Sequence, residues 1–238
     1  MRERQIVRAM AALGSAAAVV CCSGSPTGPD YNPDIPASWA ASVTNSYYPL
    51  IPGTKLDYRA QTPDGIETSR FEVLSDTRTI KGVQATIVHD QVFLDGDLIE
   101  DTFDWFAQDG AGNVWYLGED SKEIENGQVV STEGSWEWGV NGALPGVVMW
   151  ADPSAYTGSE YRQEYSKGIA EDFAQVVGLN ESVQVPAGTY TGCLKTRDRN
   201  GLVTGTVEFK YYCKDVGTVL STDQSGDQRD ELIQVTGP

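Results

Sequence analysis

The chain has 238 residues, of which 40% are hydrophobic and 10% aromatic, so it can bury a folded core. Its formal net charge of -17 excludes the basic surface that a nucleic-acid-binding protein needs to neutralise phosphates. We therefore expect no nucleic-acid partner and an acidic surface that attracts cations.

Residues 1–21 have the layout of a secretory signal. Arg2, Arg4 and Arg8 give a positive start, and an alanine-rich apolar run follows over residues 9–20. This run is too short to cross a bilayer as a mature helix, which needs ~20 apolar residues. Export from the cytoplasm is therefore expected.

Cys21 and Cys22 follow the apolar run directly and precede a polar stretch rich in Ser, Gly and Pro. This resembles a bacterial lipoprotein signal, in which aliphatic and small residues precede the cysteine that receives lipid. The resemblance implies attachment at Cys22, with Cys21 as the alternative, and a membrane association through that lipid. The absence of Asp after the cysteine resembles the pattern for the outer membrane or cell surface. Ordinary cleavage that leaves two thiols is the competing interpretation.

The rest of the chain divides into a polar Pro- and Ser-rich tether over residues 22–46 and a single β-rich domain over residues 47–238. The main apolar cluster of the tether, at residues 37–40, predicts a short docking segment. Residues 134–146 carry four glycines and fit no strand pattern, so we expect a lid-like loop or a plug over one end of the domain.

Short runs of β-branched and aromatic residues recur between turn signals such as Pro-Asp-Gly and Asp-Gly-Asp. They predict strands over residues 55–60, 66–74, 83–94, 98–107, 114–117, 160–165, 173–177, 182–185, 191–197, 206–213 and 232–236. Only residues 169–179 show a weak helical pattern. The predicted fold class is all-β and mainly antiparallel, as a curved sheet, a half-barrel, or a barrel or sandwich, with at most one short helix.

Several sequence blocks resemble an uncharacterised family of bacterial secreted and lipoprotein β-domains. They are Tyr48-Pro-Leu-Ile-Pro-Gly-Thr54 with Tyr58, Asp104-Trp-Phe-Ala-Gln-Asp109, Gly112-Asn-Val-Trp-Tyr-Leu-Gly-Glu119, and Val185-Pro-Ala-Gly-Thr-Tyr190 followed by Cys193-Leu-Lys195. The last block is also similar to half-barrel envelope proteins that carry lipid or lipoprotein. The resemblance implies a fold and an envelope location, and no particular ligand.

Cys193 and Cys213 lie on strands that we expect to be neighbours, and an oxidising compartment favours a disulfide between them. A tight turn at Asn200-Gly201 would leave them about 17 Å apart, which a disulfide cannot span. A looser loop centred near Val203 would place them opposite each other. We prefer the looser loop, because two exported free thiols are the less favoured outcome.

Aromatic residues crowd into one third of the chain. Strand alternation places Trp105 and Phe106 on opposite faces of the sheet, and Trp115 and Tyr116 likewise. Some of these rings should therefore lie outside a one-sided core, where their faces could bind sugar rings or acyl chains. The competing interpretation, which we favour for most of them, is that rings facing the sheet interior are simply core. The predicted ligand-binding residues are Trp105, Trp115, Tyr116, Trp136 and Trp138.

Catalytic signals are absent from the sequence. His89 is the one histidine, no Cys-X-X-Cys pair occurs, and no Gly-X-Ser-X-Gly elbow presents a nucleophile. Calcium is the candidate cofactor, because oxygen ligands gather in two turns; the candidate metal ligands are Asp95, Asp97, Asp101, Asp109 and Asn113. The competing interpretation is that these side chains bond their own turns.

These features favour a non-catalytic envelope lipoprotein that binds a ligand or an envelope partner, such as a lipid or another protein, through its β scaffold. No catalytic residue is assigned. The alternative is a calcium-stabilised surface or assembly protein. A hydrolase with two carboxylates ranks third, and it would need a buried acidic pair with raised pKa values in a cleft.

Overall fold

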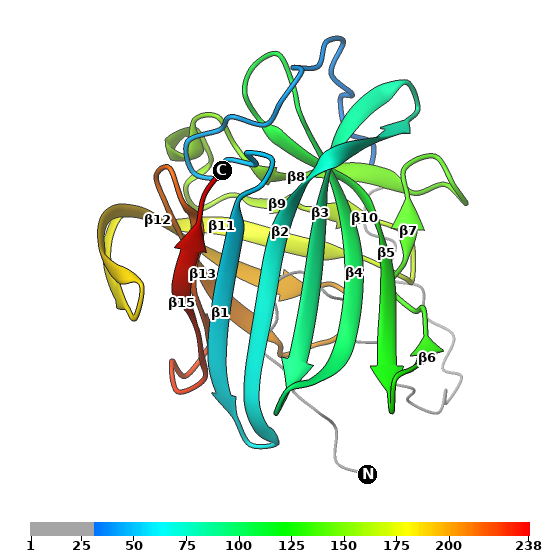
Figure 1. Cartoon of the computed structure of the whole chain (residues 1–238). Helices are drawn as coiled ribbons and strands as arrows, with labels where there is room; N and C mark the ends of the chain where they lie inside the picture. The colour runs from blue at the N-terminus through cyan, green and yellow to red at the C-terminus, as the bar shows by residue number, and fades with distance from the viewer. Residues whose placement is uncertain (1–30) are drawn as a thin grey trace.

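A single curved sheet of fifteen antiparallel strands forms nearly all of the regular structure in this computed structural model (Figure 1). The structure describes residues 31–238, so the predicted signal and lipid-attachment residues lie outside the described part. The sheet is unclosed, with the order β10-β8-β5-β4-β3-β2-β1-β15-β14-β13-β12-β11-β9 and with β6 and β7 beside β5. The all-β prediction is confirmed.

The strands of the first half are β1 (Lys55–Thr62), β2 (Gly65–Ile80), β3 (Val83–Leu94), β4 (Asp97–Gln108), β5 (Val114–Glu125), β6 (Gln128–Ser131), β7 (Trp136–Glu137) and β8 (Leu144–Met149). Those of the second half are β9 (Glu160–Arg162), β10 (Glu164–Tyr165), β11 (Asp172–Val185), β12 (Gly188–Asn200), β13 (Val207–Cys213), β14 (Gly217–Asp223) and β15 (Arg229–Thr236). A 3-10 helix, η1 (Pro153–Tyr156), lies between β8 and β9.

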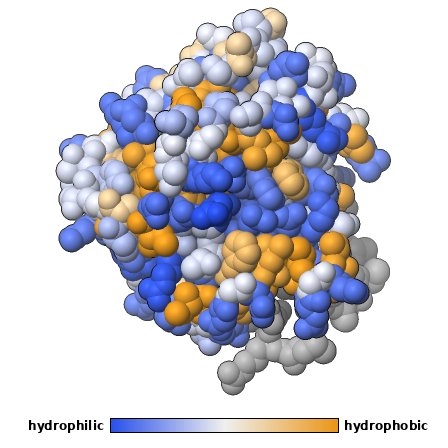
Figure 2. Space-filling view, in the orientation of Figure 1, coloured by the Kyte–Doolittle hydropathy of each residue, from blue (hydrophilic) through white to orange (hydrophobic). Residues whose placement is uncertain are grey.

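Strands β1 to β5 are consecutive hairpins, as the turn signals predict. The turns Asp95-Gly96 and Asn126-Gly127 have positive φ at both residues, which is the geometry that two-residue hairpins favour and that Gly and Asn tolerate. Figure 2 shows the outer face of these strands, where hydrophilic surface covers the middle and hydrophobic groups lie toward both ends.

The two edges of the sheet are brought together by one short stretch of chain. Strand β9 pairs with β11 at one edge and β10 pairs with β8 at the other, and Gln163 alone separates β9 from β10. The Gln163 backbone N–H donates to the Asp172 carbonyl on β11. A Cβ atom on Gly146 of β8 would lie 2.3 Å from the Gln163 carbonyl carbon, so only glycine permits this approach.

Apolar side chains cover both faces of the sheet. One cluster joins residues from β2, β3, β4, β5, β8, β11, β12 and β13, so it lies on the concave side. A second cluster draws on β2 to β5 and β8 and includes Trp105, Trp115 and Trp138; Trp39 packs against it from the convex side. Trp39 belongs to the predicted docking segment. Its ring centroid lies 6.1 Å from that of Trp115 and 6.2 Å from that of Trp138.

Two local predictions are wrong. Residues 169–179 are not helical, because most of the stretch belongs to the long strand β11. Residues 134–146 form neither a lid nor a plug: they contain β7 and run along β5, and Trp136 enters the concave cluster. A Cβ atom on Gly118 would lie 2.3 Å from the Trp136 carbonyl oxygen, so glycine at position 118 allows this close contact.

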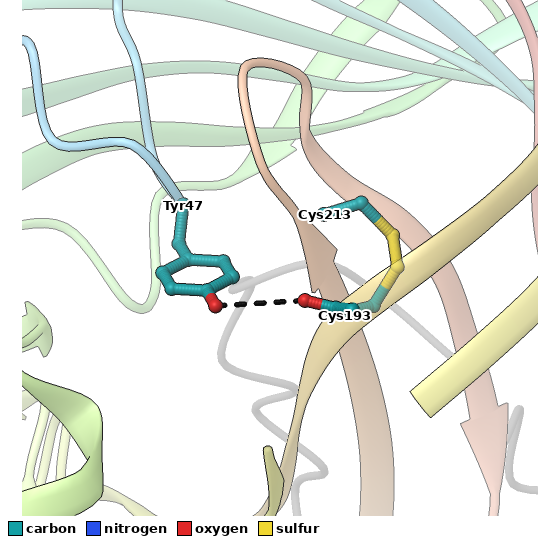
Figure 3. The surroundings of a disulfide bond; sticks show 4 residues. Tyr47, Cys193 and Cys213 are labelled. Carbon is teal, nitrogen blue, oxygen red and sulfur yellow. Dashed lines mark hydrogen bonds between the residues drawn. A yellow bond between two sulfur atoms is a disulfide. The ribbon is translucent and has the colours of Figure 1, made fainter. Parts of the chain in front are cut away.

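A disulfide joins Cys193 on β12 to Cys213 on β13 (Figure 3). The pairing of Leu194 with Tyr212 is the register of the looser loop centred on Val203. The hydroxyl of Tyr47 donates to the carbonyl of Gly192, 3.5 Å away, and so ties the segment before β1 to the bridge.

Candidate functional site

A groove of about 760 Å³ lies where the two edges of the sheet meet. Its walls come from the segment before β1, the β4–β5 turn, the outer side of β5 and β8, and the region from η1 to β11. The residues that line it are Tyr31, Pro33, Asp34, Pro36, Ser38, Asp109, Gly110, Ala111, Asn113, Trp115, Val147, Trp150, Tyr156, Glu160, Tyr161, Arg162 and Phe173. This volume is in the range of small-molecule sites.

Trp150 and Tyr156 form an aromatic wall of the groove. Their rings are stacked with centroids 3.7 Å apart, and Tyr161 meets Trp150 edge-on at 5.4 Å. The indole Nε1 of Trp150 has no hydrogen-bond partner among the described residues. Because this nitrogen is buried, the stacked pair offers the groove a flat apolar surface and no exposed donor from Trp150.

Arg162 organises a second part of the groove lining. Its guanidinium lies 4.2 Å from the ring centroid of Phe173, 4.6 Å from that of Tyr165 and 5.5 Å from that of Tyr31. Glu171 accepts a 3.3 Å hydrogen bond from it. Burial raises the pKa of Tyr31 to about 12 although Arg162 opposes this, so the Tyr31 hydroxyl stays protonated and donates to the Pro145 carbonyl.

Asp109 fixes the β4–β5 turn under the groove. Its carboxylate accepts hydrogen bonds from the Trp115 indole and from the side chain and backbone of Asn113. Burial raises the pKa of Asp109, but these hydrogen bonds outweigh it and hold the pKa below its usual value. Trp115 is therefore held in one orientation at the groove.

The five aromatic residues predicted to bind ligand do not gather at one place. Each is less than 9% exposed, so the expectation that one set is exposed is wrong. Only Trp115 lines the groove, whereas Tyr116 and Trp136 belong to the concave cluster. Trp105 and Trp138 are in the convex cluster. Alternation did separate the rings onto two faces, but Trp39 and the neighbouring strands cover both.

Other groove residues escaped the sequence prediction. Tyr31 and Phe173 come from a tether and a strand with no motif, and Arg162 lies in a short run of polar residues. Trp150 stands in the aromatic-rich third of the chain, and that was the one available signal. Only the folded sheet shows that these residues meet.

The candidate metal ligands are split between the two ends of β4. Asp95 accepts from the Ile66 backbone, and Asp101 contacts His89 at 2.6 Å. Asp97 begins β4, while Asp109 and Asn113 bond each other in the turn after it. Within residues 31–238, no three His, Cys, Asp or Glu side chains are placed to hold a metal ion.

Acidic side chains occupy the polar part of the concave side. Lys210 lies among them, with its Nζ atom 3.4 Å from Asp198 and 3.4 Å from Glu208. Burial lowers the pKa of Lys210, but Glu208 and Asp198 outweigh it, so the pKa is raised and the side chain is charged. Burial also raises the pKa of Asp104, to about 7, and that of Asp230, to about 8.

Glu119 and Glu164 extend this acidic cluster. Burial raises the pKa of both carboxyl groups well above the ordinary range. Repulsion from Glu164 adds to the shift of Glu119, and repulsion from Asp172 adds to that of Glu164. Part of the cluster, including Asp104, Lys210 and Asp230, lines a cavity of about 40 Å³. That volume fits a few water molecules and not a sugar ring.

Comparison with known protein families and with curated proteins finds no match to this chain. Among solved structures, the chain is similar to a protein of Parabacteroides distasonis ATCC 8503 that is provisionally described as a lipoprotein, with 11% identity and a TM-score of 0.38. The similarity covers 81% of this chain and 99% of that chain. So low a TM-score supports no argument, and the resemblance seen in the sequence blocks stays a prediction.

No helix within residues 31–238 is both long and apolar enough to span a membrane.

Proposed function

We propose that this chain is an exported envelope protein, anchored by lipid on Cys22, that binds a ligand in the groove without transforming it. The groove volume of about 760 Å³ and its aromatic lining carry the proposal. The stacked pair of Trp150 and Tyr156 suits a ring with one apolar face. Polar residues of the lining, such as Ser38 and Asp34, suit hydroxyl groups. A sugar ring combines both properties.

The length of the tether supports a role at the membrane surface. Nine peptide units separate Cys22 from Tyr31, which lines the groove. Even when fully extended they reach only ~30 Å, at ~3.4 Å per residue. A lipid on Cys22 would therefore keep the groove within that distance of the membrane.

The buried carboxylates do not favour a hydrolase. Asp104, Glu119 and Glu164 have raised pKa values, as a general acid requires, but they face the concave interior. The cavity there holds about 40 Å³, too little for a glycoside. Asp34, Asp109 and Glu160 line the groove. Glu160 is committed to a bidentate contact with Arg199, and Asp109 to hydrogen bonds within its own turn and from Trp115. Asp34 is left without the second carboxylate that glycoside hydrolysis needs. Binding without catalysis is the better-supported function.

The test is calorimetric titration of the full chain, in mild detergent, with a panel of neutral and acidic oligosaccharides. The variant Trp150→Ala/Tyr156→Ala removes the aromatic wall, and Tyr190→Ala removes a half-buried ring outside the groove as the matched control. We expect at least one sugar to bind, with affinity at least tenfold weaker in the groove variant and unchanged in the control.

Two results would overturn the proposal. One is the absence of binding by every member of the panel. The other is binding that the groove variant and the control weaken equally, because that would place the ligand elsewhere. Mass spectrometry of the purified chain tests the anchor separately: a lipid-sized mass increment should be present, and it should disappear in Cys22→Ser.

A further inference from the structure

Four cationic side chains lie together on the outer face of β9, β11, β12 and β13. They are Arg162, Lys195, Arg197 and Arg199, which with Phe173, Phe209 and Tyr211 make up what we call the basic strip. The residues that alternate with them on β12, Leu194, Thr196 and Asp198, are buried. Strand alternation therefore turns the cations outward.

The strand register sets the spacing of the strip. Lys195, Arg197 and Arg199 occupy every second position of β12, so they form a row with steps of ~6.8 Å. Arg197 is paired with Phe209 on β13, and Arg199 with Phe173 on β11. Cations and ring faces thus alternate across neighbouring strands.

Two of the cations make no direct ion pair within residues 31–238, although Arg197, after Arg199, helps to lower the pKa of Glu160. Lys195 Nζ lies 4.2 Å from the ring centroid of Phe209 and 5.0 Å from that of Tyr211, and it makes no ion pair there. Arg197 likewise has no ion pair or hydrogen bond from its side chain in the described part. Arg199 by contrast is bound to Glu160. Lys195 and Arg197 are therefore available to an anion.

The basic strip is continuous with the groove. Phe173 lies between the guanidinium groups of Arg162, at 4.2 Å, and Arg199, at 3.9 Å, measured to its ring centroid. Arg162 and Phe173 also line the groove. A chain-like ligand leaving the groove over Phe173 would reach Arg197 and then Lys195.

Charge complementarity identifies the occupant. The chain has a net charge of -17, so a row of outward cations is unusual on its surface and would attract an anion specifically. Ring faces beside the cations suit a chain of ring-shaped units. We propose that the ligand is an acidic polysaccharide, with one sugar ring in the groove and carboxylate, phosphate or sulfate groups over Lys195 and Arg197. This inference rests on the groove being the binding site.

The experiment uses the full chain in mild detergent and three polymers with the same glucose backbone: dextran, carboxymethyl dextran and dextran sulfate. The test variant is Lys195→Gln/Arg197→Gln. The matched control, Arg59→Gln/Lys81→Gln, removes the same charge from two exposed cations on β1 and the β2–β3 turn. Vesicles of phosphatidylglycerol form a separate arm.

We expect an acidic dextran to bind at least tenfold more tightly than dextran. The test variant should lose that preference, and the control should keep it. The slope of the logarithm of the binding constant against the logarithm of the salt concentration should become shallower by about one unit per cation removed, by analogy with polyphosphate binding. The Trp150→Ala/Tyr156→Ala variant should weaken binding of the acidic polymer as well, because the strip and the groove would hold one ligand.

Other outcomes overturn the inference in distinguishable ways. Equal affinity for the charged and neutral polymers, lost in the groove variant, would refute the basic strip and leave the groove intact. Acidic binding that is lost in the strip variant but kept in the groove variant would refute the groove. Strip-dependent binding to the vesicles without polymer binding would assign the strip to a membrane surface. Binding of no probe would refute both.

Discussion

Replacement of Lys210 by Met should destabilise the protein strongly at pH 8 and much less at pH 5. The Lys210 side chain is 6% exposed, and its Nζ atom lies 3.4 Å from a carboxylate oxygen of Asp198 and of Glu208. With an effective dielectric constant of ~20, each contact represents about 5 kcal/mol of attraction before the desolvation cost. Removal of one partner from a buried ion pair typically costs ~3–5 kcal/mol.

The pH dependence follows from the carboxyl groups that Lys210 leaves behind. Burial raises the pKa of Glu208 to about 7 even with Lys210 present, and loss of Lys210 would raise it further. At pH 8 the unfolded chain has released this proton, so the folded variant must either bury an unpaired carboxylate or keep the proton at a cost in stability, whereas at pH 5 that cost is much smaller. We therefore expect the melting temperature to fall by about 6–20 °C at pH 8. At pH 5 the loss should be ~1–2 kcal/mol.

Thermal unfolding followed by circular dichroism at both pH values measures this difference. Lys122→Met is the matched control, because Lys122 pairs with Asp120 near the surface and should contribute ~0–1 kcal/mol. A triple variant that adds Asp198→Asn and Glu208→Gln to Lys210→Met should recover much of the lost stability at pH 8. A Lys210→Met loss below ~1 kcal/mol, or an equal loss at both pH values, would refute this account of the acidic interior.

The wild-type protein should lose stability between pH 5 and pH 8, because buried acids with raised pKa values hold protons in the folded state that the unfolded chain has released. Added salt should not abolish this trend. Asp230→Asn should make the decline shallower throughout pH 5–8, because burial raises the pKa of Asp230 to about 8 and the folded chain keeps a proton that the unfolded chain has released; a decline as steep as in the wild type would contradict this. Replacing Cys193 and Cys213 by Ser should cost about 3 kcal/mol in denaturant unfolding, since the bridge closes a 20-residue loop, and an unchanged midpoint would contradict it. Gly146→Ala should cost at least ~1–3 kcal/mol by overpacking, with Gly237→Ala as a neutral control.

Alternation and turn chemistry made the fold class readable from the sequence. The predicted run at residues 83–94 coincides with β3, and the Asp95-Gly96 turn leads into β4 as expected. The prediction missed strands that lack runs of β-branched and aromatic residues. Strand β8 contains Pro145 and Gly146, and β14 is rich in Thr and Ser, so neither was predicted.

For the cysteine pair, the sequence predicted part of the outcome and the tertiary structure decided the rest. Strand geometry limited the sequence to two registers and allowed a disulfide in only one, but the choice between them depends on a loop with no fixed turn type. The pairing of β12 with β13 made that choice. The aromatic residues behave similarly: alternation assigned Trp115 and Tyr116 to opposite faces, and tertiary packing decided that both faces are covered.

The sequence by itself determined an antiparallel β fold and an acidic composition, and it predicts an export signal, because periodicity, composition and leader layout are local properties of the chain. Only the tertiary structure decided where the two edges of the sheet meet, and this meeting point forms the groove. Tyr31, Trp150, Arg162 and Phe173 come from four separate segments, and no spacing along the chain relates them. Lys210 likewise reads as an ordinary strand lysine until the curvature of the sheet surrounds it with carboxyl groups.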